Sequence, residues 1–141
     1  HEGGGVFSQD TESGERTGVA GPGREYFKTH HPKLALPQSL GPSGWWNRPY
    51  EELPELLARA RRVREGLLQR HGNSADRVAL ISHVGFCHFF LSKLLNVPAT
   101  EDRTYWFHLN NTGISHISFE ERRIKVNYLN RVDFLPTDLI T

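Results

Sequence analysis

The chain has 141 residues, 37% hydrophobic and 11% aromatic, which is enough apolar mass to bury a core as one globular domain. Seventeen lysines and arginines oppose sixteen aspartates and glutamates, so the net charge of +1 excludes a strong field for nucleic acid or an acidic membrane surface. The single cysteine, Cys87, excludes an internal disulfide and a multi-cysteine metal site, and it fits a reducing, cytoplasmic compartment.

Residues 1–48 contain nine of the thirteen glycines and four of the eight prolines, a composition that resists long regular elements. We expect an extended surface segment there, with one short helix over residues 23–31. Trp45 and Trp46 are expected to anchor this segment to the rest of the fold, because no basic groove accompanies them as it would at a base-stacking site.

Residues 49–71 repeat apolar positions at three- and four-residue steps with charged residues between them, which predicts an amphipathic helix. Pro54 suits its first turn. The apolar positions are Leu53, Leu56, Leu57, Ala60, Val63, Leu67 and Leu68.

A short apolar run over residues 77–83 follows a polar loop and predicts a buried strand. Residues 85–95 predict a second helix that ends near Asn96. The order helix, strand, turn, helix is one α/β crossover unit, so residues 49–141 are expected to form the α/β core of a single domain, residues 1–141.

Residues 113–119 and 123–130 alternate apolar and polar positions on either side of a charged turn, which predicts a C-terminal antiparallel hairpin. This hairpin is expected to close the edge of the sheet. The longest apolar run is too short to span a bilayer, so we expect no membrane segment.

The triplet Arg70-His71-Gly72 has the same residues as a motif whose histidine accepts a phosphoryl group. A nucleophile of this kind is fixed on the turn just after a buried strand, whereas the residues before His71 have helical periodicity. We therefore expect His71 to be an ordinary residue of a helix's last turn, where positive charge complements the helix dipole.

His83 has the opposite context, since it lies where the predicted strand ends and the next helix begins. Ligands of α/β folds bind at this edge. The amides of Val84 and Gly85 head the helix and can hold an anion such as phosphate. The alternative is a structural histidine whose hydrogen bonds are satisfied within the protein at the end of the strand.

The eight histidines suggest a metal, but they show neither the helical i, i+4 pair nor the Cys/His cluster that metal sites use. A glycine-rich nucleotide loop between a strand and a helix is also absent from the sequence. We expect no metal and no cofactor.

Several segments resemble motifs of one family. Residues 78–85 (VALISHVG) resemble the second-histidine motif of the histidine phosphatase superfamily, and residues 111–115 (NTGIS) resemble the asparagine-containing turn that opens its late strand. Residues 1–4 (HEGG) are similar to the stretch that brings its general acid, and residues 44–51 match the segment before the second histidine. The resemblance covers essentially the whole chain and implies a three-layer α/β/α, phosphoglycerate mutase-like sandwich.

The resemblance also implies a chemistry. In this family a histidine attacks phosphorus, a phosphohistidine forms and water hydrolyses it, while a carboxylic acid protonates the leaving oxygen. Carried over to this sequence, Glu2 is the acid, His83 is the second histidine, Gly85 is a backbone donor and Asn111 is a pocket residue. The ligand is then a small phosphorylated substrate or inorganic phosphate.

The sequence departs from the family at its amino end. The family's nucleophile and its two phosphate-binding arginines precede the acid, and nothing precedes Glu2 here except His1. We expect the C-terminal part of a phosphomonoester hydrolase, incomplete at the N-terminus and inactive alone, which associates with the missing segment or forms a homo-oligomer. The alternatives are a phosphoglycerate-type mutase and a catalytically inactive binding or regulatory relative.

Overall fold

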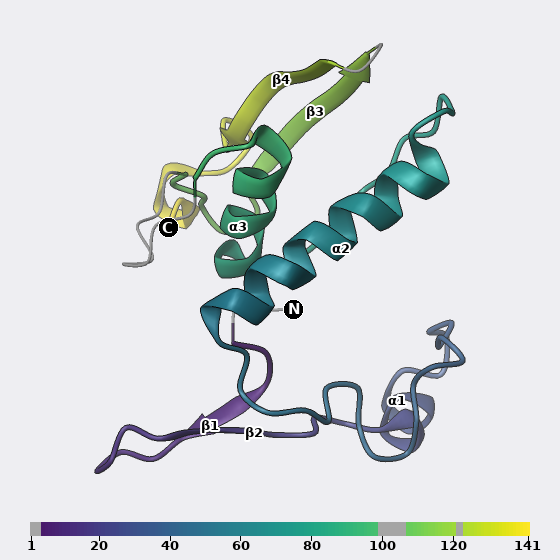
Figure 1. Cartoon of the computed structure of the whole chain (residues 1–141), viewed down its shortest axis with the longest axis vertical. Helices are drawn as coiled ribbons and strands as arrows, with labels where there is room; N and C mark the ends of the chain where they lie inside the picture. Colours follow the sequence, from purple (N-terminus) through teal and green to yellow (C-terminus); the bar gives the residue numbers. More distant parts are fainter. Residues whose placement is uncertain (1–3, 99–106, 121–122) are drawn as a thin grey trace. The chain divides into compact units, whose positions relative to one another are not determined.

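The computed structural model describes residues 4–98, 107–120 and 123–141. It divides into two compact units, His1–Leu53 and Pro54–Thr141, which we call unit 1 and unit 2. This division falls close to the boundary expected between residues 48 and 49; that the two parts form a single domain stays a prediction. The elements in chain order are β1 (Phe7–Gln9), β2 (Arg16–Gly18), α1 (Arg24–His30), α2 (Leu53–His71), α3 (Val84–Leu95), β3 (Ile114–Glu120), β4 (Arg123–Arg131) and the 3₁₀ helix η1 (Thr137–Leu139) (Figure 1).

Unit 1 begins with a short antiparallel hairpin of β1 and β2, in which Phe7 lies opposite Gly18. A side chain organises its turn: Asp10 Oδ1 accepts hydrogen bonds from the backbone N–H groups of Ser13 (2.7 Å) and Glu12 (3.0 Å). These donors favour the ionised carboxylate and hold the pKa of Asp10 below its ordinary value. The hairpin was not among the expected elements, because strands of three residues are too short to show an alternating pattern.

Trp46 is the anchor of unit 1. Its side chain is 4% exposed, its backbone N–H donates to the carbonyl of Ala20 (3.0 Å) and its indole Nε1–H donates to the carbonyl of Pro49 (3.2 Å). Gly5 has a left-handed φ of 78°, and a Cβ at this position would overlap the Trp46 indole. These contacts lie within unit 1, so the expected anchoring of this segment to the rest of the fold stays a prediction. The predicted short helix is confirmed as α1.

Unit 2 is built on α2 and α3, which confirm the two predicted helices. The buried apolar residues are Leu56 and Ala60 on α2 and Phe86, Phe89, Leu91 and Leu94 on α3. A cation–π contact joins the helices, since the guanidinium of the buried Arg59 lies 4.4 Å from the centre of the Phe86 ring. Within the described part of the chain, helices that could cross a membrane by length and apolar content are absent.

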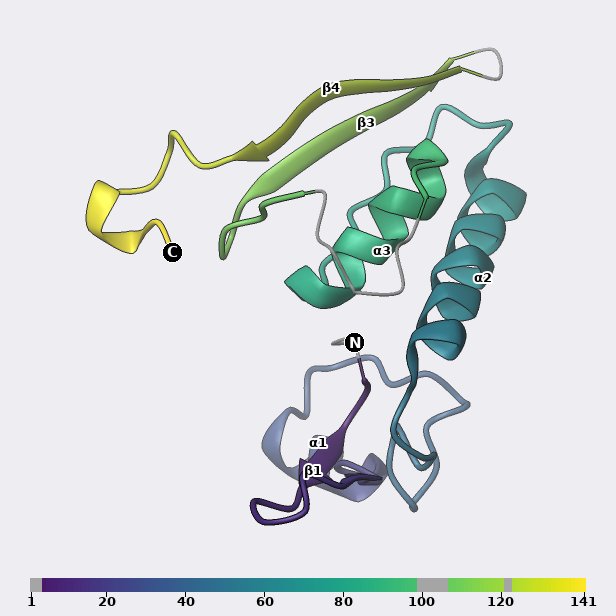
Figure 2. The same ribbon diagram turned by 60° about the vertical axis from the view of Figure 1, so that its left-hand side comes forward.

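The predicted C-terminal hairpin is confirmed, but the expectation that it closes the edge of a larger sheet is wrong, because among the described residues β3 and β4 form a two-stranded sheet of their own. β3 and β4 pair antiparallel from Ile114↔Arg131 to Glu120↔Arg123, with an irregular register around His116, and Figure 2 shows them side by side along their length. Asn130 lies near the end of β4, away from the hairpin turn, and has a left-handed φ of 52°. Its backbone N–H donates to Ser115 Oγ (3.1 Å). Three helices and two antiparallel hairpins give unit 1 and unit 2 together a mixed α/β composition, as expected.

The prediction of a strand over residues 77–83 is wrong, because the structure describes these residues and they form no strand. This segment is a coil between α2 and α3, and the two described sheets contain only β1–β2 and β3–β4 (Figure 2). Its apolar side chains are exposed, and Ile81 reaches 94%. The apolar, β-branched sequence favours a strand, but a strand forms only where a neighbour supplies its backbone hydrogen bonds.

We predict that Phe89→Ala lowers the free energy of unfolding by about 3–5 kcal/mol, because Phe89 is only 2% exposed and its loss leaves a cavity in the core of unit 2. Phe134→Ala is the matched control in the same unit, since Phe134 is 51% exposed. Urea unfolding followed by circular dichroism measures both. Equal losses in the two variants would contradict the core described here.

Candidate active site

His83 lies directly before α3 and is exposed. As the N-cap residue it has an extended backbone (φ −102°, ψ 155°), and its side chain makes no capping hydrogen bond to the helix. Its carbonyl accepts the first helical hydrogen bond, from the backbone N–H of Cys87 (2.9 Å). His83 therefore lies at the N-terminal end of the helix, as predicted, although the strand expected before it does not form.

The first amides of α3 face the same end. The N–H groups of Val84 and Gly85 precede the first helical hydrogen bond, so the helix itself supplies them no acceptor, and they carry the positive end of its dipole. Gly85 is buried and adds no side chain above its amide. His83, Val84 and Gly85 follow one another in the sequence, and their predicted role in binding an anion stays a prediction.

Asn111 lies in the turn before β3 and contacts the C-terminal residue of the chain. Its Nδ2–H donates to Thr141 Oγ1 (2.8 Å), and its backbone N–H donates to the Thr141 carbonyl (3.3 Å). The neighbouring Asn110 donates from Nδ2 to the same carbonyl (3.0 Å). The predicted pocket role of Asn111 stays a prediction, and in this structure its amide holds Thr141.

Glu2 lies outside the described residues, so its role as the general acid stays a prediction. Among the described residues, groups of three or more histidine, cysteine, aspartate or glutamate side chains that could hold a metal ion are absent. The site is therefore composed here of His83 and the start of α3.

His71 is the last residue of α2, as predicted. Its Nδ1–H donates to Asp76 Oδ2 (2.8 Å), and its carbonyl accepts a hydrogen bond from Ser74 Oγ (3.0 Å). The hydrogen bond from His71, with a smaller effect from Ser74, holds the pKa of Asp76 below its ordinary value. His71 thus contributes to the polar end of the helix.

A family model described as histidine phosphatase superfamily (branch 1) matches residues 21–132, more than half of the chain. The chain belongs to the histidine phosphatase superfamily. His83, Val84, Gly85 and Asn111 lie inside the matched range, and Glu2 lies before it. Membership supports a phosphatase- or mutase-type activity. Searches of curated proteins and of solved structures found no match.

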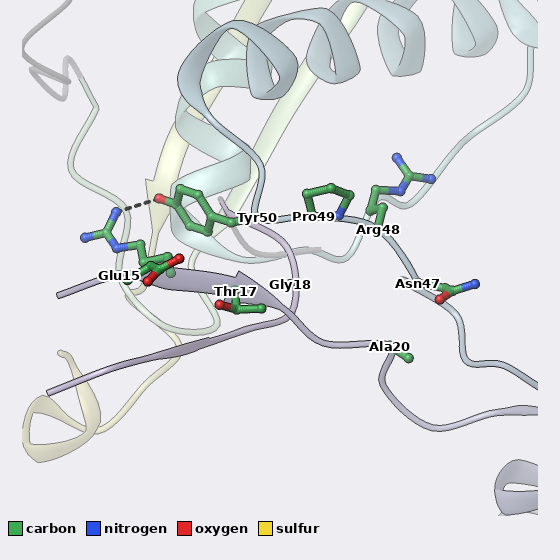
Figure 3. Close-up of a pocket in the computed structure, with 9 residues that line it drawn as sticks. Glu15, Thr17, Gly18, Ala20, Asn47, Arg48, Pro49 and Tyr50 are labelled. Atoms are coloured by element: carbon green, nitrogen blue, oxygen red, sulfur yellow. Dashed lines mark hydrogen bonds between the residues drawn. The ribbon is translucent and has the colours of Figure 1, made fainter. Parts of the chain in front are cut away.

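This superfamily member also has a polar pocket in unit 1, of about 470 Å³, lined by residues 15–18, Ala20 and residues 47–50 (Figure 3). Arg16 donates from Nη1 to the Tyr50 hydroxyl (2.6 Å), the hydrogen bond drawn as a dashed line. Sequence reasoning missed this pocket, because its two sides are more than thirty positions apart and neither carries a motif.

We predict that His71→Ala raises the pKa of Asp76 toward the ordinary aspartate value, because the variant removes the larger of the two hydrogen bonds that stabilise its carboxylate. An NMR titration of the side-chain carboxyl carbons measures this. Asp10 is the internal control, since Ser13 and Glu12 hold its pKa low independently of His71. An unchanged Asp76 titration would show that the His71–Asp76 contact does not exist in solution.

Proposed function

We propose that this protein hydrolyses small phosphate monoesters through a phosphohistidine intermediate, and that His83 is the second histidine of the site. The observation that supports this most is the position of His83, exposed at the start of α3 and inside the range that the family model matches. The imidazole and the amides of Val84 and Gly85 donate to the phosphoryl oxygens as negative charge develops on them.

The reaction has two steps. A histidine nitrogen attacks phosphorus and the bond to the ester oxygen breaks, while Glu2 gives its proton to the leaving alkoxide. Water then attacks the phosphohistidine and the P–N bond breaks, with the Glu2 carboxylate accepting a proton from the water. The products are an alcohol and inorganic phosphate, and no metal or cofactor takes part in either step.

His71 does not supply the nucleophile in this proposal. It lies at the C-terminal end of α2, where the partial negative charge of the helix disfavours a phosphate dianion, and the Asp76 carboxylate adds a second negative charge beside it. We therefore assign the nucleophile to a segment that the 141 residues do not include.

That segment has a place to bind in this proposal. Residues 77–81 form no backbone hydrogen bond with the described strands, and their apolar side chains are exposed. A strand supplied from outside the 141 residues pairs with them and brings its histidine to the end of the segment where His83 lies. Parallel neighbours in a sheet end at the same edge, which is the edge where α/β folds bind ligands.

Asn111 joins the site only when Thr141 releases its amide, because the two side chains are hydrogen-bonded to each other. The ligand is a small phosphate ester or inorganic phosphate. We place the protein in the cytoplasm, where the one cysteine, Cys87, stays reduced.

The test uses the full-length chain with its upstream sequence and an aryl phosphate whose release is measured by absorbance. We expect His83→Ala to lower kcat/KM by about 10²–10³-fold, the usual cost of losing one donor to the developing charge. His71→Ala is the matched control and keeps the activity. Acid-quenched phosphoenzyme, trapped with labelled substrate, reports the intermediate.

Undiminished hydrolysis by the His83→Ala variant would remove His83 from the site. Loss of activity in His71→Ala alone would transfer the nucleophile to α2 and refute the proposal. Transfer of the phosphoryl group to a second hydroxyl, without phosphate release, would replace the hydrolase with a mutase.

A further inference from the structure

We propose that the pocket beside β2 in unit 1 is an oxyanion-binding site centred on Arg16, and that it takes a phosphate or carboxylate group of a small molecule. The site is independent of His83 and of the phosphoryl transfer proposed above. It is built from the β1–β2 hairpin and the segment 47–50, which approach each other at Tyr50 (Figure 3).

The Arg16 side chain is held in place although it is exposed. Its guanidinium carbon lies 5.1 Å from the centre of the Tyr50 ring and 5.9 Å from that of Phe7, and these two rings pack edge to face at 4.9 Å. The hydrogen bond to the Tyr50 hydroxyl adds a third restraint. A guanidinium fixed in this way loses little further conformational entropy when it binds an anion.

The positive charge of Arg16 is not neutralised by the described residues. Its hydrogen bonds go to two uncharged acceptors, the Tyr50 hydroxyl from Nη1 and Gln9 Oε1 from Nε (3.3 Å), and it forms no ion pair with a described carboxylate. A guanidinium has five N–H donors. The Nη2 donors make no hydrogen bond to a described residue, so they remain available to a ligand.

The pocket as a whole carries a net positive charge. Arg48 lines it on the other side of Pro49, and its guanidinium lies 4.8 Å from the centre of a Trp46 ring without an ion pair to the described part of the chain (Figure 3). Glu15 is the acidic residue of the lining. Two arginines and one glutamate give the pocket a formal charge of +1, and charge-assisted hydrogen bonds from arginine suit a planar or tetrahedral oxyanion.

NMR titration of the 141-residue chain tests the site, with sodium phosphate and sodium acetate in separate series at constant ionic strength. We expect saturable shifts at the Arg16 Nε–H and the Thr17 amide with at least one anion. A response to phosphate alone identifies a phosphorylated ligand, and a response to acetate as well extends it to carboxylates. The absence of saturable shifts with both anions would overturn the proposal.

One substitution at the site and one control outside it test the assignment to Arg16. Arg16→Gln should weaken anion binding about tenfold or more, because it removes a charge-assisted donor. Arg62→Gln, on the exposed side of α2 in unit 2, makes the same change in net charge and should leave the affinity unaltered. Equal affinities in these two variants would refute the assignment to Arg16.

Arg16→Gln can weaken binding by disturbing the β1–β2 hairpin, so a second variant, Glu15→Gln, tests the site without changing Arg16. The hydrogen bonds of Glu15 to the described residues use its backbone, so the variant preserves the turn. Removing its charge should tighten anion binding about two- to fivefold, and an unchanged affinity would contradict an anion held in this pocket. His83→Ala should leave these shifts intact, which separates this site from the proposed catalytic one.

Discussion

The contact between Arg59 of α2 and Phe86 of α3 is the constraint on which the candidate site depends. Phe86 is the third residue of α3, and the Arg59 guanidinium covers its ring, so the contact fixes the first turn of the helix. That turn carries the amides of Val84 and Gly85 and follows directly on His83. Core packing therefore sets the direction in which the helix presents its unpaired N–H groups. A cation–π contact at this place also lets α2 bury an arginine with its charge stabilised by the ring.

Unit 1 reaches a defined structure by other means, because it has few buried aliphatic residues. Aromatic rings supply several contacts between distant positions of this unit. Trp46 packs closely over Gly5, where any side chain would overlap the indole, and Phe7 and Tyr50 share the Arg16 guanidinium. A chain segment rich in glycine and proline is thus held by a few large rings, and the glycine is needed for close approach.

Local patterns predicted most of the elements, and non-local pairing accounts for what they missed. The three- and four-residue steps of α2 and the alternation in β3 and β4 are properties of neighbouring positions, and both elements form as expected. His83 was placed correctly for the same reason, since a junction before a helix is visible within a few residues. Residues 77–83 have the composition of a strand, but they form one only if a second strand, distant in sequence, pairs with them. The contact of Asn111 with Thr141 joins positions thirty residues apart, and the sequence near either residue contains no pattern that predicts it.

The two histidines show why residue letters alone do not define a phosphate site. His71 stands in an Arg-His-Gly triplet, yet it ends a helix, at the negative end of the dipole. His83 lacks such a triplet, yet it precedes a helix, at the positive end of the dipole, where the first N–H groups have no acceptor within the helix. Because a phosphate dianion is attracted at one end of a helix and repelled at the other, the direction of the chain at each histidine decides between them. Asp76 adds to the contrast, since its carboxylate places a further negative charge beside His71, and this charge repels a phosphate dianion.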